Sequence, residues 1–149
     1  GNNVLFAKEL GLEATSEFAR FENIFIGVSG LSDLPTREIL RRANHFAQQH
    51  GGSAKASPFG QPRRTERWAL CTGAGASTET LEEARTAHID TLIVGEGPHW
   101  TAVYAEENEI AIIYAGHYVT EILGVCALAK HLAEKFDVPW QFVAAPTGL

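Results

Sequence analysis

The stretch Ile110-Ala-Ile-Ile-Tyr-Ala-Gly-His-Tyr-Val-Thr-Glu121 decides how this chain is expected to fold. It opens with a nearly unbroken apolar run, Ile110 to Ala115, which predicts a strand covered on both faces. A glycine follows, and the sequence then changes to helical periodicity, which predicts a long helix from Thr120 to Phe136. A buried strand that leads straight into a helix is typical of α/β proteins.

The same alternation of strand and helix extends along most of the chain. Upstream, Thr91-Leu-Ile-Val94 is a second short apolar run and predicts a second buried strand. The other expected strands are residues 23–28, 68–72 and 141–144, and the other expected helices are residues 2–10, 34–49, 80–87 and 99–107. Residues 53–64 contain Gly, Pro and Ser without periodicity and are expected to form a loop. We therefore predict a single α/β domain over residues 1–149, with a mainly parallel or mixed sheet flanked by helices and an undetermined strand order.

The composition limits the classes of partner. The 149 residues are 45% hydrophobic and 20% charged, as in a soluble globular domain. Acidic residues outnumber basic ones by 18 to 12, which argues against a nucleic-acid surface. No apolar run approaches the ~18 residues of a membrane span, and no secretory signal opens the chain. Cys71 and Cys126 have no partner at a metal or redox spacing, so a reduced, cytoplasmic location is expected.

His117 and Glu121 lie four residues apart at the opening of the long predicted helix. At 3.6 residues per turn these positions stack on one helix face, so both side chains reach one point. An imidazole and a carboxylate placed in this way form a ligand pair for Zn²⁺, Mn²⁺ or Fe²⁺. The pair also follows a strand, at the edge where open α/β sheets bind ligands. The spacing alone fits equally well a histidine near a helix start beside an ordinary surface glutamate.

A second polar pair, Glu96 and His99, follows the strand that comes one unit earlier, in the sequence Gly95-Glu-Gly-Pro-His99. Two neighbouring strand ends that each offer one His and one Glu indicate a shared site. The pair would serve as further ligands, as groups that orient the ligands, or as a general acid and base beside a metal ion. The alternatives are helix capping for Glu96 and a structural hydrogen bond for His99.

Two other features of the sequence have residue types that can form a site. The turn Thr72-Gly-Ala-Gly-Ala-Ser77 joins a strand to a helix but lacks the Lys-Ser/Thr of a phosphate-binding loop. A tight turn with close backbone packing is the favoured interpretation, and an anion on its amides is the alternative. The remaining histidines have no partner at ligand spacing, and we interpret them as structural or solvated: His45, His50, His88 and His131.

Two segments of the chain resemble the Nif-three-like dinuclear-metal proteins, also known as GTP cyclohydrolase type-two-like proteins. They are Thr91-Leu-Ile-Val-Gly-Glu-Gly-Pro-His99 and Tyr114-Ala-Gly-His-Tyr-Val-Thr-Glu-Ile-Leu-Gly124. The glycine-rich turn at 73–77 and the opening Gly1-Asn2-Asn3 also match the family pattern. The resemblance covers essentially the whole chain.

The resemblance implies an α/β fold, a ring-shaped homo-oligomeric hexamer and two divalent metal ions of the Zn, Mn or Fe class. It implies that His117 and Glu121 are metal ligands and that Glu96 and His99 lie near the site, where we assign them as candidate catalytic groups. The expected function is a metal-dependent hydrolase or cyclohydrolase that acts on a small-molecule or phosphate-bearing ligand. The alternative is a non-catalytic oligomeric binding or scaffold protein.

The sequence departs from the family at its start. Family members carry a His-His pair near the N-terminus and an Asp shortly before the Gly-Asn-Asn turn, and these residues complete the metal site. This chain begins at Gly1-Asn2-Asn3, and residues 1–70 offer no substitute. We expect it to be the C-terminal part of a longer member, with an incomplete metal site and little or no activity by itself.

Overall fold

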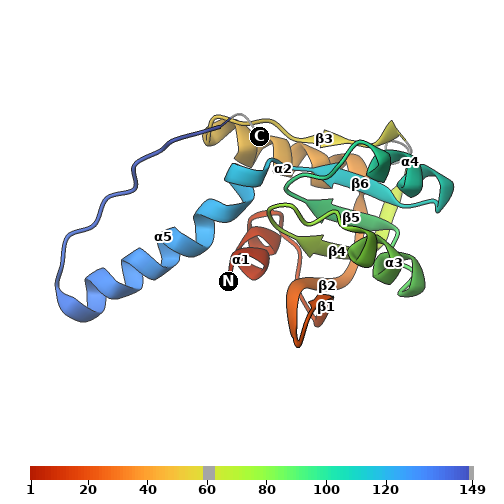
Figure 1. Ribbon diagram of the computed structural model, residues 1–149. Coiled ribbons are helices and arrows are strands. Elements are labelled where there is room, and N and C mark those ends of the chain that lie inside the picture. Colours follow the sequence, from red (N-terminus) through yellow and green to blue (C-terminus); the bar gives the residue numbers. More distant parts are fainter. Residues whose placement is uncertain (59–62, 148–149) are drawn as a thin grey trace.

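The computed structural model describes residues 1–58 and 63–147, which form a mixed sheet between two layers of helices (Figure 1). The strands are β1 (Ser16–Phe21), β2 (Ile24–Pro35), β3 (Lys55–Ala56), β4 (Arg64–Cys71), β5 (Thr91–Val94) and β6 (Ala111–Tyr114). The helices are α1 (Asn2–Glu9), α2 (Thr36–Gln49), α3 (Thr78–Thr86), α4 (Trp100–Glu107) and α5 (His117–Phe136). The predicted α/β class, with a mixed sheet flanked by helices, is confirmed.

The strand order in the sheet is β1-β2-β4-β5-β6-β3. The central strands β4, β5 and β6 are parallel, whereas β1 with β2, β2 with β4, and β3 with β6 are antiparallel. The sheet is therefore mixed, and the expectation of a mainly parallel sheet holds only for its centre. Because β4, β5 and β6 run in one direction, the loops after all three strands lie at one edge of the sheet.

Each face of the sheet has its own core. Ile93 of β5 packs in one cluster with Phe6 of α1 and Ile39 of α2, and all three are fully buried. Its neighbour Leu92 points to the opposite face and packs in a second cluster with Leu81 of α3. This alternation explains why the central strands are apolar throughout, since both faces of the sheet are covered.

The long helix α5 begins in the body of the protein and extends well beyond it (Figure 1). It starts at His117, three residues before the predicted start at Thr120. Only its first turns contribute buried residues, Val119, Thr120 and Ile122. These anchored turns therefore carry the predicted ligand pair, and they do so at the edge where β6 ends.

Two other predictions about the elements were wrong, and one strand was not predicted at all. Ser16–Phe21 forms β1 although its two buried residues, Phe18 and Ala19, are consecutive and break the period-two alternation of a strand. Lys55–Ala56 lies in the expected loop 53–64 but pairs with β6 as β3. Residues 59–62 of that expected loop lie outside the described residues.

The predicted strand at residues 141–144 does not form either. This segment has no strand partner in the described chain, and its side chains are exposed. The pattern Gln-Phe-Val-Ala favours extended backbone, but a strand also needs a neighbour for its hydrogen bonds. The tail instead runs back along α5 as an extended segment (Figure 1).

Candidate metal centre

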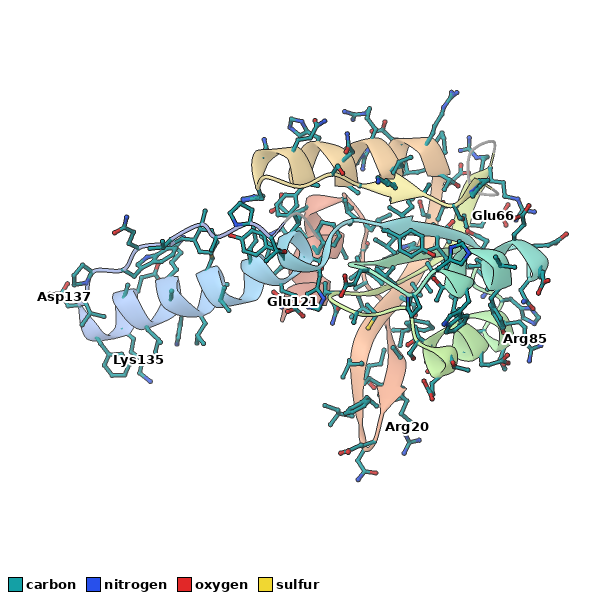
Figure 2. The ribbon with its side chains drawn as sticks, turned by 45° about the horizontal axis from the view of Figure 1, so that its top comes forward. Arg20, Glu66, Arg85, Glu121, Lys135 and Asp137 are labelled. Atoms are coloured by element: carbon teal, nitrogen blue, oxygen red, sulfur yellow. The ribbon has the colours of Figure 1, made fainter. Side chains whose placement is uncertain are left out.

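His117 is the centre of the predicted site. Its Nδ1 lies 2.8 Å from Oε1 of Glu96, and its Nε2 lies 3.4 Å from Oε2 of Glu121. The structure thus brings together three of the four residues that the sequence singled out. Figure 2 shows Glu121 where α5 joins the body of the protein. The side chains of His117 and Glu121 are 39% and 48% exposed, so a solvent ion can reach them.

The two nitrogens of His117 have different roles. An ionised carboxylate only accepts hydrogen bonds, so Nδ1 donates its proton to Glu96. In the neutral imidazole Nε2 then presents a lone pair toward the Glu121 carboxylate. The hydrogen bond to Glu96 raises the pKa of His117 above its ordinary value, and the charge of Glu121 adds to this, while burial opposes both. The arrangement therefore favours a positive charge, either a proton or a cation, between Nε2 and Glu121.

The glycine-rich turn packs directly on this group. Gly73, with φ of +65°, donates its N–H to Oγ1 of Thr120 over 3.0 Å, and this hydroxyl donates to the His117 carbonyl over 3.0 Å. The Gly73 carbonyl accepts the N–H of Glu96 over 2.8 Å. A Cβ added at Gly73 would lie 2.6 Å from Oε1 of Glu121. Hydrogen bonds thus join the glycine-rich turn, the loop after β5 and the start of α5. This fits the interpretation of residues 72–77 as a tight turn with close backbone packing.

His99 is the predicted site residue that the structure leaves apart. It is exposed at the start of α4, and its side chain makes no hydrogen bond within residues 1–58 and 63–147. The loop that carries it is held by Thr101, whose hydroxyl donates to the Pro98 carbonyl over 2.6 Å and lies 2.8 Å from the Tyr114 hydroxyl. The catalytic role of His99 stays a prediction. Glu96, by contrast, binds His117 and does not cap a helix.

Sequence reasoning did not identify two residues that support the site. Thr120 is fully buried and is hydrogen-bonded to both Gly73 and His117, and its only signal was its place in the family stretch Gly116-His-Tyr-Val-Thr-Glu121. The side chain of Asn3 accepts the N–H of Thr72 over 2.8 Å and donates to the carbonyl of Ile26. The only signal for Asn3 was the opening Gly-Asn-Asn of the family pattern.

The described residues contain no group of three or more His, Cys, Asp or Glu side chains that could hold a metal ion. Within these residues His117 and Glu121 form a close pair, and Glu96 contacts the other nitrogen of the imidazole. In the same residues, no helix is both long and apolar enough to cross a membrane.

Fold and site together define an α/β protein with a histidine–glutamate cluster at the carboxyl edge of its parallel strands. The chain belongs to the Duf34/NIF3 (NGG1p interacting factor 3) family, whose model matches residues 1–147. It is 35% identical over its whole length to a protein of Deinococcus radiodurans named GTP cyclohydrolase 1 type 2 homolog. It is 38% identical over its whole length to a protein of the same name from Pyrococcus horikoshii.

Solved structures show the same relationship. The whole chain superposes on a structure described as protein ybgI, of unknown function, with a TM-score of 0.83 and 26% identity. It also superposes on TTHA1606 from Thermus thermophilus, with a TM-score of 0.72 and 28% identity. The chain spans only 55% and 58% of the two named relatives and 57% and 56% of these two structures. It therefore corresponds to about half the length of the proteins that it resembles.

Proposed function

We propose that His117 and Glu121 are two ligands of a divalent metal ion of the Zn, Mn or Fe class. The observation that carries the proposal is the 3.4 Å approach of Nε2 of His117 to Oε2 of Glu121, while Nδ1 is bonded to Glu96. A metal-bound histidine commonly donates its other N–H to a carboxylate, which fixes the ring and makes it a better ligand. Imidazole and carboxylate donors suit this class of ion.

We further propose that the intact protein is a metal-dependent hydrolase or cyclohydrolase. Support comes from relatives that are named GTP cyclohydrolase 1 type 2 homologs. A divalent ion supplies Lewis acidity that polarises a substrate oxygen. Within this chain Glu96 holds the proton on Nδ1 of His117, and its second oxygen remains available to accept one from a ligand. His99, exposed on the neighbouring loop, is the proposed second proton-transfer group.

The remaining ligands of a two-metal site are proposed to come from the part of the family sequence that this chain does not span. Two side chains alone hold an ion weakly, so little or no activity is expected of the chain by itself. We propose a cytoplasmic homo-oligomer, a hexamer by family resemblance. Large apolar side chains exposed along α5, such as Leu128 at 58% and Leu132 at 40%, are compatible with burial in an assembly.

The second candidate function is a non-catalytic oligomeric binding or scaffold protein. The observation in its favour is the lack of a three-ligand group among residues 1–58 and 63–147. On this proposal the assembly, not the metal ion, carries the biological role. Loss of metal would then leave that role intact.

The deciding experiment measures metal content by elemental analysis, and then hydrolysis of a panel of nucleotides and phosphodiesters, in the family-length protein. His117→Ala is expected to remove both metal and hydrolysis. His131→Ala is the control, because His131 is exposed farther along the same helix. Hydrolysis that survives complete loss of metal in His117→Ala contradicts the hydrolase proposal, and full metal occupancy in that variant contradicts the ligand assignment.

A further inference from the structure

A cavity of about 430 Å³ opens beside the candidate metal ligands. Its polar end is formed by Glu96, His117 and Glu121. No Lys or Arg is among the residues that line it. The part of the site that this chain supplies therefore offers no cationic side chain to the phosphates of a nucleotide, which usually bind Arg, Lys or clustered backbone amides.

Apart from Tyr118 and Thr147, the rest of the cavity lining is apolar. Ile122 and Val125 continue the same side of α5 beyond Glu121, at helical spacing. Phe142 lines the same cavity from the tail that runs back along α5. Val125 is 58% exposed and Phe142 is 38% exposed, so both have apolar surface that a ligand can cover. Covering such apolar surface stabilises a complex, because the surface is removed from water.

The tail is held at this position by a contact with the helix. The N–H of Ala145 donates to the hydroxyl of Tyr118 over 3.0 Å, and Tyr118 itself lines the cavity. The Tyr118 hydroxyl oxygen thus accepts one hydrogen bond from the tail. No hydrogen bond in the described residues uses its proton, which can be donated to a polar atom of a ligand.

We infer that this cavity binds a small amphipathic molecule, with an oxygen-donor head at His117 and Glu121 and an apolar group of about ring size against Val125 and Phe142. The inference rests on the proposed function, because the head group meets a metal ion held at the polar end. The inference specifies the substrate class of the proposed function: this chain contacts the apolar part of the ligand and not a phosphate chain. A ring between an aromatic side chain and branched aliphatic ones gains contact on both faces.

The test compares two hydroxamates, which share an oxygen-donor head and differ in one group. Benzohydroxamate carries a phenyl ring and acetohydroxamate a methyl group, and each is titrated calorimetrically into the chain with and without Zn²⁺. We expect benzohydroxamate to bind at least about tenfold more tightly, which corresponds to about 1.4 kcal/mol. Phe142→Ala is expected to remove that advantage and to leave the affinity for acetohydroxamate unchanged.

Two further variants keep the result interpretable. Val143→Ala is the matched control, because Val143 is adjacent on the tail, is 76% exposed and does not line the cavity. Val125→Ala tests the part of the lining that the helix supplies and should resemble Phe142→Ala. Equal affinity for the two hydroxamates, or an advantage that Val143→Ala removes as well as Phe142→Ala, overturns the inference.

Metal content, measured separately, distinguishes failure of the ligand inference from failure of the metal proposal. If the chain binds zinc but does not discriminate between the hydroxamates, the ligand inference is wrong and the metal proposal stands. If the family-length protein, which is proposed to carry the remaining ligands, binds no zinc, the metal proposal fails, and the ligand inference is judged on the metal-free titration of the chain. Benzohydroxamate binding that depends on Phe142 then sustains the inference, and the absence of such binding overturns it.

Discussion

Gly73 and Glu121 lie so close together that no residue with a side chain fits at position 73 without moving the carboxylate. A Cβ added at Gly73 would lie 2.6 Å from Oε1 of Glu121 and 3.4 Å from Nε2 of His117. The backbone of Gly73 also has φ of +65°, which residues other than glycine rarely adopt. This one contact couples the loop after β4 to the first turns of α5, and it leads to the first prediction.

Gly73→Ala should displace the Glu121 carboxylate and weaken metal binding. The left-handed backbone should also cost about 1 to 2 kcal/mol of unfolding free energy. Gly11→Ala is the matched control: Gly11 has φ of +69° and lies in the loop after α1, where an added Cβ meets the guanidinium of Arg42. Both variants should lose stability in urea titrations, but only Gly73→Ala should lose metal by elemental analysis. Equal metal content in the two variants would contradict the role given to Gly73.

Glu96→Gln should weaken metal binding while the fold is kept. The change removes the negative charge that faces Nδ1 of His117 over 2.8 Å, and with it the largest cause of the raised pKa of His117. Groups that orient a metal ligand in this way typically account for about 10- to 100-fold in metal affinity. Competition with a chelator measures the change. Glu106→Gln, at an exposed position of α4, is the control and should leave metal affinity unaltered.

Asn3→Ala should destabilise the protein and loosen the glycine-rich turn. The Asn3 side chain accepts the N–H of Thr72 and donates to the Ile26 carbonyl, so it joins α1 to the turn and to β2. Its removal leaves both backbone groups without this partner, at a cost of about 1 to 3 kcal/mol. Asn23→Ala, in the exposed turn between β1 and β2, should change the unfolding free energy by less than about 0.5 kcal/mol.

Much of the site could be predicted because it depends on positions along single elements. The four-residue spacing of His117 and Glu121 is enough to place both on one face of α5, and the structure confirms that placement. Glu96 follows the neighbouring parallel strand, so its side chain reaches His117 once β5 and β6 are adjacent. Helical period and strand direction therefore account for these three residues.

The remaining features depend on contacts that no local pattern specifies. Thr120 is hydrogen-bonded to Gly73 only because the turn after β4 meets the first turn of α5, which is distant in the sequence. The direction of β2 relative to β4 is likewise set by pairing across the sheet. The strand at 141–144, by contrast, was predicted from a local pattern but does not form. Its residues favour extended backbone, but the described sheet ends at β3 on one side and β1 on the other, and neither pairs with the tail.

Cys71 provides a prediction about pH. Its side chain is 2% exposed, and burial, with a smaller contribution from the charges of Glu83 and Glu121, raises the pKa of the thiol from 9.0 to about 11. In the unfolded chain the thiol ionises near pH 9, whereas in the folded protein it stays protonated. The stability that depends on this proton is therefore complete below pH 9 and is lost as the pH rises toward 11.

The measurement is urea unfolding of the wild type and of Cys71→Ala between pH 8 and pH 11. The difference in unfolding free energy between them should shift by up to about 3 kcal/mol over this range, in favour of Cys71→Ala at high pH. Cys126→Ala, at a partly exposed position of α5, should show no such shift relative to the wild type. A constant difference between wild type and Cys71→Ala at every pH would show that the thiol is free to ionise in the folded protein. Thiol labelling at pH 8 checks the same point, since only Cys126 should react before the protein unfolds.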